Sequence, residues 1–336
     1  MTEMRDFTPS LLEPFGLRAR RVTRAYGAFI CETPQGLKIV KKTAASAGEI
    51  WFAHGAKEHL ADNGYRMTDR FRITTEGEPY AVAGAECYTV RDWLPGEEPE
   101  LREAGQVRWI AEELGRMSRC SAGYRAPEKS RSLNRCHELP EQLHKRVRRL
   151  ENYGRSLKKN GRYTDFDLML LDCLPLHIEQ ARQAESLILD PAFAREADRI
   201  EAQAVFAHHH FSNHTVLWGQ DRMLITDFEN ACYTMPMLDL VDYTEKVLRK
   251  NDWDIRQGIG LLEAYDRVAR ISPVQSRILY AGLLFPGRLA ELCTEVYSVR
   301  RNWTPLAYGR KLAELQEQQE ARRQFLMYYE QHCLDG

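Results

Sequence analysis

The chain has 336 residues, with 47 Lys and Arg against 48 Asp and Glu, a formal net charge of −1 and 43% hydrophobic residues. This balance gives no general attraction to nucleic acid or to an anionic membrane surface, so neither is expected as a partner. The composition predicts a folded chain, and at about 150 residues per domain its length allows two domains or one two-lobed unit. No apolar run approaches the roughly 18 residues that span a bilayer and the first residues lack a signal-peptide pattern, so a cytoplasmic protein is expected.

The first part of the chain predicts a small antiparallel sheet that carries one helix. Short β-like stretches separated by turn residues lie at 22–25, 28–32 and 37–41, and further ones at 71–74 with 80–82 and at 87–90. A helix is predicted from Ser46 to about Leu60, because Ser46 and Glu49 have the spacing of a capping box. A Pro95-Gly96 break ends the pattern. Residues 1–96 are therefore predicted to form a five-stranded β-rich lobe.

After Gly96 the sequence is predicted to be mainly helical, so residues 97–336 form the second, larger lobe. Residues 107–118 carry apolar side chains at the spacing of one buried helix face. Long amphipathic patterns follow to about residue 190 and again from residue 240, and residues 312–319 are predicted to form a plain surface helix.

The region at 204–229 differs from the sequence on either side of it, which is predicted to be helical. It predicts a loop flanked by two short β-like runs and holds four of the ten histidines: His208, His209, His210 and His214. The second run ends at Asp227, and a strand that ends on an aspartate often presents its carboxylate to a ligand. No cysteine or carboxylate at ligand spacing completes a tetrahedral set within the loop, so no zinc is expected.

These features together resemble the aminoglycoside phosphotransferase and choline kinase superfamily, and within it the CotS-type spore coat proteins. The residues that carry the resemblance are Val40-Lys41, Trp93-Leu94-Pro95-Gly96, Leu114-Gly115-Arg116-Met117, Ile225-Thr226-Asp227-Phe228-Glu229, Leu238-Asp239-Leu240, Leu284-Phe285-Pro286 and Arg323-Gln324-Phe325-Leu326. The resemblance implies an α+β, protein-kinase-like two-lobed fold with its hinge near Gly96. It covers nearly the whole chain.

The resemblance implies roles for several residues that this chain retains. Lys41 would pair with the phosphates of ATP, Gly27 would lie at the Tyr26-Gly27 tip that covers them, and Asp227 would hold Mg²⁺. Asp239 would be structural. From the residues alone, Lys41 also fits a solvated lysine and Asp227 a carboxylate that caps backbone amides. ATP and Mg²⁺ binding are therefore left open.

Active members of the superfamily carry a catalytic loop of the form H-x-D-x-x-x-x-N, and this chain departs from it at two positions. The resemblance places His208 on the first histidine, His210 on the catalytic aspartate and Thr215 on the metal-binding asparagine. An imidazole does not reproduce the charge of a carboxylate, and a general base contributes about 10²- to 10⁴-fold to the rate. The shorter Thr215 hydroxyl replaces a carbonyl oxygen that reached the metal ion. Both changes weaken phosphoryl transfer.

Three hypotheses follow from the retained and altered positions. The first is a sporulation-associated spore coat pseudokinase that acts as a binding or assembly module, with other spore coat proteins as partners and a place in the coat. The alternative is an ATP-dependent small-molecule phosphotransferase, similar to aminoglycoside, choline or homoserine kinases, with a catalytic loop rebuilt around His210. The third is a regulatory pseudokinase that binds nucleotide to set its shape.

Overall fold

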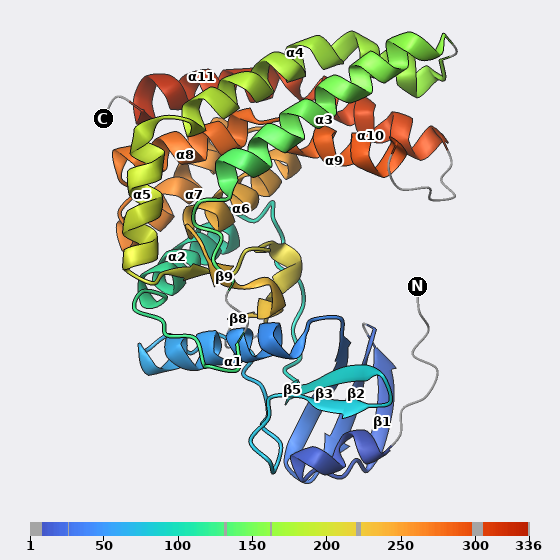
Figure 1. Ribbon diagram of the computed structural model, residues 1–336, viewed down its shortest axis with the longest axis vertical. Coiled ribbons are helices and arrows are strands. Elements are labelled where there is room, and N and C mark those ends of the chain that lie inside the picture. The colour runs from blue at the N-terminus through green and yellow to red at the C-terminus, as the bar shows by residue number, and fades with distance from the viewer. Residues whose placement is uncertain are drawn as a thin grey trace. The chain divides into compact units, whose positions relative to one another are not determined.

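The computed structural model describes residues 9–25, 27–130, 133–161, 163–219, 223–297 and 305–334, and these form two compact units. Unit 1 contains residues 1–100, 116–134 and 203–233, and unit 2 contains residues 101–115, 135–202 and 234–336. Figure 1 shows the β-rich part of unit 1 in blue and cyan and the helices of unit 2 mainly in green, yellow and red. The predicted division into lobes at 1–96 and 97–336 stays a prediction.

The sheet of unit 1 has five antiparallel strands, as predicted. The strands are β1 (Arg21–Ala25), β2 (Ala28–Thr33), β3 (Gly36–Thr43), β4 (Ala81–Ala83) and β5 (Glu86–Asp92), in the order β1-β2-β3-β5-β4. Two short 3-10 turns, η1 (Pro9–Leu11) and η2 (Glu13–Phe15), precede the sheet. Leu12, between them, and Phe15 join the apolar cluster that also contains Val40 and Val90. Burial of these side chains holds the sheet to the turns that precede it.

The predicted strand at 71–74 is wrong. Only Phe71 makes an isolated bridge, to Arg91, and the chain then turns, because the amide of Thr74 donates to Glu78 O (2.8 Å) and the amide of Gly77 donates to Thr74 O (3.0 Å). A local turn thus satisfies the backbone groups that a strand would have paired.

The one helix of the β-rich part is α1 (Ala47–Asp62), and its predicted start is confirmed. Ser46 is the N-cap, and a capping box joins Ser46 to Glu49. Glu49 is therefore engaged in the cap of α1.

The later segment of unit 1 forms the predicted loop between short strands. Its elements are β6 (Phe206–Ala207), η3 (Asn213–Thr215), β7 (Val216–Trp218), β8 (Met223–Ile225), η4 (Phe228–Asn230) and β9 (Cys232–Tyr233). β6 pairs with β9 and β7 pairs with β8, both antiparallel. Asp227 lies two residues after the end of β8 and is the N-cap of η4.

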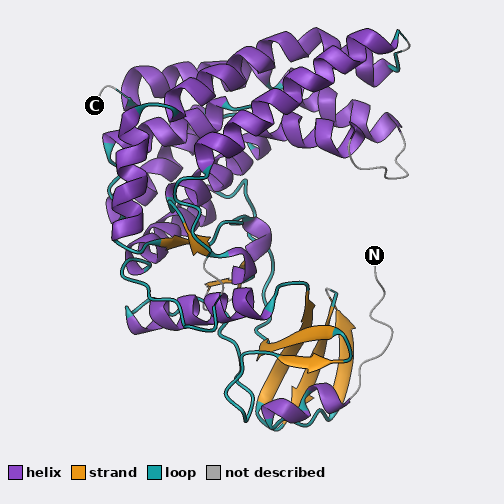
Figure 2. Ribbon diagram, viewed as in Figure 1, coloured by secondary structure: helices purple, strands orange, loops and turns teal. Residues whose placement is uncertain are grey.

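The described residues of unit 2 are helical apart from their connections, as Figure 2 shows in purple. The helices are α2 (Ala104–Cys120), which continues into unit 1, α3 (Leu139–Asn160), α4 (Asp165–Ile188), α5 (Pro191–Ala202), α6 (Met237–Lys250), α7 (Ile255–Val268), α8 (Pro273–Leu284), α9 (Gly287–Tyr297), α10 (Pro305–Glu317) and α11 (Gln319–Cys333). The predicted surface helix at 312–319 is the junction of α10 and α11, and Leu312 is fully buried, so its description as a plain surface helix is wrong.

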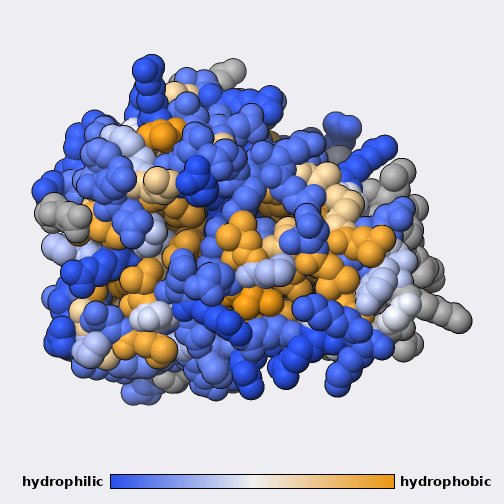
Figure 3. Space-filling view, turned by 90° about the horizontal axis from the view of Figure 1, so that it is seen from above, coloured by the Kyte–Doolittle hydropathy of each residue, from blue (hydrophilic) through white to orange (hydrophobic). Residues whose placement is uncertain are grey.

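The face seen in Figure 3 is mainly hydrophilic, with hydrophobic side chains between the polar ones. Three of the basic residues near the start of α3 have partners within the protein. Lys145 pairs with Glu141 (2.6 Å), Arg148 pairs with Glu151 (3.4 Å), and Arg146 lies over the Phe285 ring. None of the helices in the described part of the chain combines the length and apolar character needed to cross a membrane.

Candidate functional site

Strand pairing places two cations on one face of the unit 1 sheet. In the antiparallel pair β3 and β5, Lys41 lies opposite Thr89, and Ile39 lies opposite Arg91. Paired residues of antiparallel strands share a face, and residues two apart on one strand share it as well. The side chains of Lys41 and Arg91 therefore project from the same side as diagonal neighbours.

A second set of backbone contacts brings two acidic side chains to that face. The amide of Ile225, at the end of β8, donates to Met67 O (2.8 Å), and the amide of Asp69 donates to Ile225 O (3.3 Å). These bonds hold Asp69 beside the strand end that carries Asp227. Because Phe71 also bridges to Arg91, the 67–71 segment joins β8 to β5.

The result is a cluster of six charged side chains, here named the charge cluster. Its members are Lys41, Lys57, Asp69, Arg91, Asp227 and Glu229, all in unit 1. The cluster holds three cations and three carboxylates. Formal charges within it therefore cancel.

Asp227 is paired with two cations. Lys41 Nζ lies 2.5 Å from Asp227 Oδ1, and Arg91 Nη1 lies 3.6 Å from the same oxygen. Burial opposes ionisation of Asp227, but the positive charges of Lys41 and Arg91 outweigh it and lower the pKa of Asp227. The backbone of Asp227 is left-handed, with φ of 62°, a conformation that aspartate tolerates better than most residues. The side chains of Lys41 and Asp227 are about one-third exposed, at 34% and 35%.

The inner part of the charge cluster is almost fully buried. The Arg91 side chain is 3% exposed and Lys57 is fully buried. Lys57 Nζ donates to Asp69 Oδ1 (2.7 Å) and Asp69 O (2.9 Å), while Arg91 Nη1 donates to Asp69 Oδ2. Burial lowers the pKa of Lys57, and the Asp69 carboxylate opposes this shift. For Arg91, burial also favours the neutral form, but the carboxylates of Asp69, Glu229 and Asp227 outweigh it and raise the pKa.

His208 lies in the interior at the first position of the predicted catalytic loop. Its side chain is buried, and its Nε2 lies 2.7 Å from Thr226 O, so Nε2 donates this bond to the carbonyl. Burial lowers the pKa of His208 to about 4, which makes the neutral ring the form present at neutral pH. His208 thus ties the loop to the residue that precedes Asp227.

The two altered loop positions have different surroundings. His210 is exposed, whereas Thr215 is buried. The Thr215 hydroxyl donates to Ser212 O (2.9 Å) and accepts from the amide of Ser212 (3.1 Å). Two local hydrogen bonds therefore occupy the hydroxyl that the sequence places at the metal-binding position.

Glu98 holds the residues between these positions. Glu98 Oε2 accepts from Asn213 Nδ2 (2.9 Å) and from His214 Nδ1 (2.7 Å). Glu97, its neighbour, makes a bridge to Trp218. The segment that follows Gly96 thus contacts the predicted catalytic loop within unit 1.

The remaining predicted residues occupy separate places. Gly27 lies in the turn between β1 and β2 with φ of 70°, where glycine is favoured, and its neighbour Tyr26 lies outside the described residues. Asp239 is 1% exposed in the first turn of α6, in unit 2, where a helix dipole stabilises a carboxylate. The assigned roles of Gly27 and Asp239 stay predictions.

The charge cluster is a poor match to a divalent metal site. The carboxylates nearest Asp227 already have protein cations as partners, and the Thr215 hydroxyl is bonded to Ser212. Among the described residues, no group of three or more His, Cys, Asp or Glu side chains is arranged to hold a metal ion. For a nucleotide the fit is closer, because Lys41 is partly exposed, but a phosphate would have to replace Asp227 as the partner of Lys41.

Sequence reasoning missed Lys57, Asp69 and Arg91. Lys41 Nζ pairs with Asp227, and no described glutamate lies within 4 Å of it. One signal was present: Arg91 directly follows the predicted strand at 87–90, and a charge that a longer strand would carry into the interior needs a partner.

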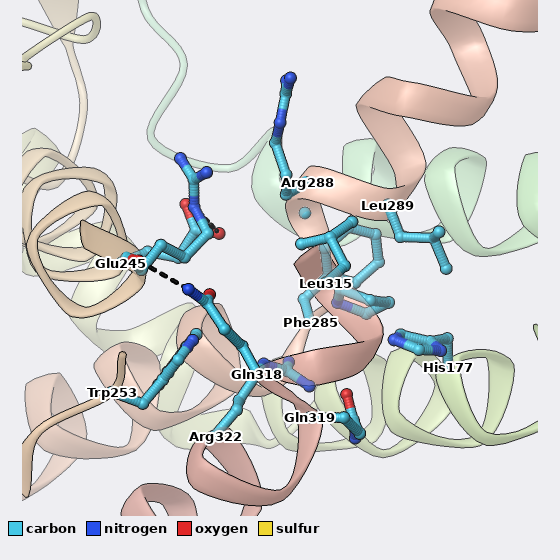
Figure 4. A pocket seen from close by; sticks show the side chains of 13 residues that line it. His177, Glu245, Trp253, Phe285, Arg288, Leu289, Leu315, Gln318, Gln319 and Arg322 are labelled. Carbon is cyan, nitrogen blue, oxygen red and sulfur yellow. Dashed lines mark hydrogen bonds and ion pairs between the residues drawn. The ribbon is translucent and has the colours of Figure 1, made fainter. Parts of the chain in front are cut away.

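Unit 2 contains a pocket between α4, α6, α11 and the segment around Phe285 (Figure 4). Its main polar groups are used within the protein. Gln318 Nε2 donates to Arg249 O (2.9 Å) and Asp252 Oδ1 (3.0 Å), and Arg249 pairs with Glu245 (3.1 Å). We assign no ligand to this pocket.

Comparison with known proteins agrees with the kinase-like fold. The chain is 20% identical to Spore coat protein S of Bacillus subtilis (strain 168) over 330 residues, which cover 97% of this chain and 92% of that protein. Among solved structures, an aminoglycoside phosphotransferase from Alicyclobacillus acidocaldarius is similar with a TM-score of 0.87, at 17% identity and covering 98% of this chain and 97% of that one. The spectinomycin phosphotransferase APH(9)-Ia, solved with ADP and spectinomycin, gives a TM-score of 0.64 at 12% identity, over 96% and 97% of the two chains.

The family assignment is more specific than these pairwise similarities. The sequence profile of the family described as "Spore coat putative kinase YutH" matches residues 9–329, which is nearly the whole chain. The chain therefore belongs to the YutH family of kinase-like spore coat proteins.

Proposed function

We propose that the protein is a pseudokinase of the spore coat, a kinase-like binding or assembly module that does not transfer phosphate at kinase rates. The observation that carries the proposal is the state of the catalytic loop. An exposed histidine, His210, stands where the resemblance expects the catalytic carboxylate, and the Thr215 hydroxyl is bonded to Ser212. Phosphoryl transfer depends almost entirely on positioned charge, so loss of both groups removes most of the catalysis.

The proposed setting is the spore coat, with other coat proteins as partners. The family description and the name of the Bacillus subtilis relative support this setting. A fluorescent fusion followed through sporulation tests it. The proposal expects the signal to stay with the spore after release and to enter the coat extract, and a signal that remains in the mother-cell lysate contradicts it.

The test of the pseudokinase proposal is a phosphotransfer assay on the full chain with labelled ATP, Mg²⁺ and a panel of hydroxyl-bearing acceptors. The proposal expects no turnover that depends on Asp227, so wild type and Asp227→Ala give the same background. The paired variant His210→Asp with Thr215→Asn restores the residue types of an active loop and is assayed beside the wild type for comparison. Ordinary kinase turnover, about 1–100 per second, that disappears in Asp227→Ala would contradict the proposal.

The alternative function is a small-molecule phosphotransferase that uses His210. The high TM-score to an aminoglycoside phosphotransferase and the adjacency of Lys41 to Asp227 favour it. This alternative requires magnesium-dependent ATP turnover and its loss in His210→Ala. His137→Ala is the control, because it removes an exposed histidine that belongs to unit 2 and not to the predicted catalytic loop.

A further inference from the structure

We infer that Arg91 is the resident counter-ion of Asp227 and Glu229. Its guanidinium supplies the positive charge that a divalent cation would otherwise supply, and the charge cluster therefore binds no metal. The inference deepens the proposed pseudokinase function and rests on it for the identity of the site. It concerns three residues to which the sequence resemblance gave no role: Arg91, Lys57 and Asp69.

The geometry around Arg91 supports this assignment. Its two terminal nitrogens face three carboxylates, with Nη1 bonded to Asp69 and 3.6 Å from Asp227 Oδ1, and with Nη2 3.9 Å from Glu229 Oε1. A planar guanidinium that stays charged at all ordinary pH values suits such a position, because it offers several donors in fixed directions. Arg91 thus contacts the two acidic side chains of the 227–229 motif at once.

Arg91 is also held so that a metal ion cannot easily displace it. Its side chain is 3% exposed. The Asp69 carboxylate that accepts from Arg91 also accepts from the fully buried Lys57. Withdrawal of Arg91 would leave Asp69 with half of its partners and would need space that the packed interior lacks. The Phe71 ring, 4.1 Å from Lys57 Nζ and 5.7 Å from the Arg91 guanidinium carbon, fills the adjoining volume.

The charge balance leads to the same conclusion. Three cations and three carboxylates already cancel within the charge cluster. A divalent ion at Asp227 would have to expel Lys41 and would then lie beside the fixed positive charge of Arg91. Carboxylates attract Mg²⁺ or Mn²⁺ less strongly when neighbouring cations already offset their charge.

The experiment is a Mn²⁺ titration of the full chain, followed by electron paramagnetic resonance of the free ion. The wild type and Asp227→Asn are expected to bind Mn²⁺ equally, with no saturable site that depends on Asp227. Arg91→Met combined with Asp69→Asn removes one cation and one carboxylate, so the formal charges of the cluster still cancel. It takes away the one described cation within 4 Å of Glu229, however, and leaves Asp227 paired with Lys41 alone. This paired variant is expected to gain at least about tenfold in Mn²⁺ affinity, which corresponds to about 1.4 kcal/mol.

Two control variants test whether a gain in Mn²⁺ affinity comes from loss of the positive charge at Arg91. Arg91→Lys keeps the positive charge and is expected to bind no more Mn²⁺ than the wild type. Arg70→Met removes an exposed arginine of the same unit whose partner is Glu58, outside the charge cluster, and is expected to change nothing. Circular dichroism before each titration establishes that the variant is folded.

The outcomes separate the inference from the proposed function. A wild-type Mn²⁺ site that is lost in Asp227→Asn overturns the inference even if the paired variant does not fold, and so does a folded paired variant without a gain. If such a site exists but the phosphotransfer assay shows no turnover, the pseudokinase proposal still stands. Turnover that depends on Asp227 but needs no metal would instead contradict the proposed function alone.

Discussion

Each of the two units contains a buried arginine, and the two are stabilised in opposite ways. Arg91, in unit 1, faces the carboxylates of Asp69, Asp227 and Glu229. Arg322, in unit 2, has only neutral hydrogen-bond acceptors among the described residues: Gln180 Oε1 (2.7 Å), Leu283 O (2.9 Å) and Leu284 O (2.7 Å). The two sites share a residue type and a degree of burial but differ in charge.

The difference appears in the pKa values and indicates two roles. Burial favours the neutral form of both arginines, yet the three carboxylates raise the pKa of Arg91, whereas the pKa of Arg322 is lowered to about 10. Arg322 caps the C-terminal carbonyls of α8, where a cation is favoured by the helix dipole, so its role is structural. Arg91 instead forms ion pairs with Asp227 and Glu229, the basis of the inference that it is their resident counter-ion. Variants of these residues test that contrast.

The largest effect is expected for Arg91→Met. It leaves the buried Asp69 with a single cation and Glu229 with none, and removal of one partner from a buried ion pair costs about 3–5 kcal/mol of unfolding free energy. The loss should shrink as pH falls, because protonation of the stranded carboxylates relieves it. Urea unfolding at several pH values measures both effects. Arg70→Met is the control, and equal losses in the two variants would contradict the account.

Arg322→Met is expected to cost less, about 2–3 kcal/mol, because it strands neutral carbonyl and amide oxygens rather than charges. The loss should not change between pH 5 and 8, since none of the stranded acceptors titrates there. Hydrogen exchange at the end of α8 should accelerate. Arg323→Met, which removes the exposed neighbour that pairs with Glu320, serves as the matched control and should be nearly neutral. A loss of stability that depends on pH for Arg322→Met would contradict the contrast between charged partners at Arg91 and neutral partners at Arg322.

Asp227→Asn is expected to cost about 1 kcal/mol at neutral pH, since the pair with Lys41 is one-third exposed and solvent screens it. The pKa of Asp227 is lowered in the folded state, so the ion pair stabilises fully above the unfolded-state pKa of about 3.9 and its contribution is lost as pH falls through the lower folded value. The wild type and the variant should therefore converge in stability below about pH 4. A difference that persists in acid would mean that Asp227 acts through its backbone conformation instead.

Lys41→Met should have the smallest effect, a few tenths of a kcal/mol, because Arg91 still neutralises Asp227. Thermal unfolding at low and high salt provides the measurement. A loss larger than that of Arg91→Met would reverse the order and place the principal counter-ion at Lys41.

The sequence predicted much of the fold from local patterns. Alternating residues and turns predicted the meander of β1 to β3, and the Ser46 and Glu49 spacing predicted the start of α1, because these signals act over a few residues. The strand at 71–74 failed because only Phe71 and Arg72 pair with β5, and the chain then enters a local turn at Thr74. Burial of Leu312 also escaped prediction, since it depends on packing between segments distant in the sequence.

The site was predicted only in part. The motif resemblance singled out Lys41 and Asp227, which the structure brings to 2.5 Å from each other. The role of Arg91 could not be read from the sequence, because it follows from strand register and from the pairing of residues 67–69 with β8. Charges from five separate segments balance one another only after the chain has folded.

The most direct test of the central claim is the thermal stability of the full chain with ATP in Mg²⁺ compared with ATP in EDTA. If Arg91 replaces the metal, any stabilisation by ATP should be the same in both conditions. At an ATP concentration about 100 times its dissociation constant, a bound ligand stabilises by about 2.7 kcal/mol, which is readily measured. A stabilisation of that size that needs Mg²⁺ and disappears in Asp227→Ala would contradict the account.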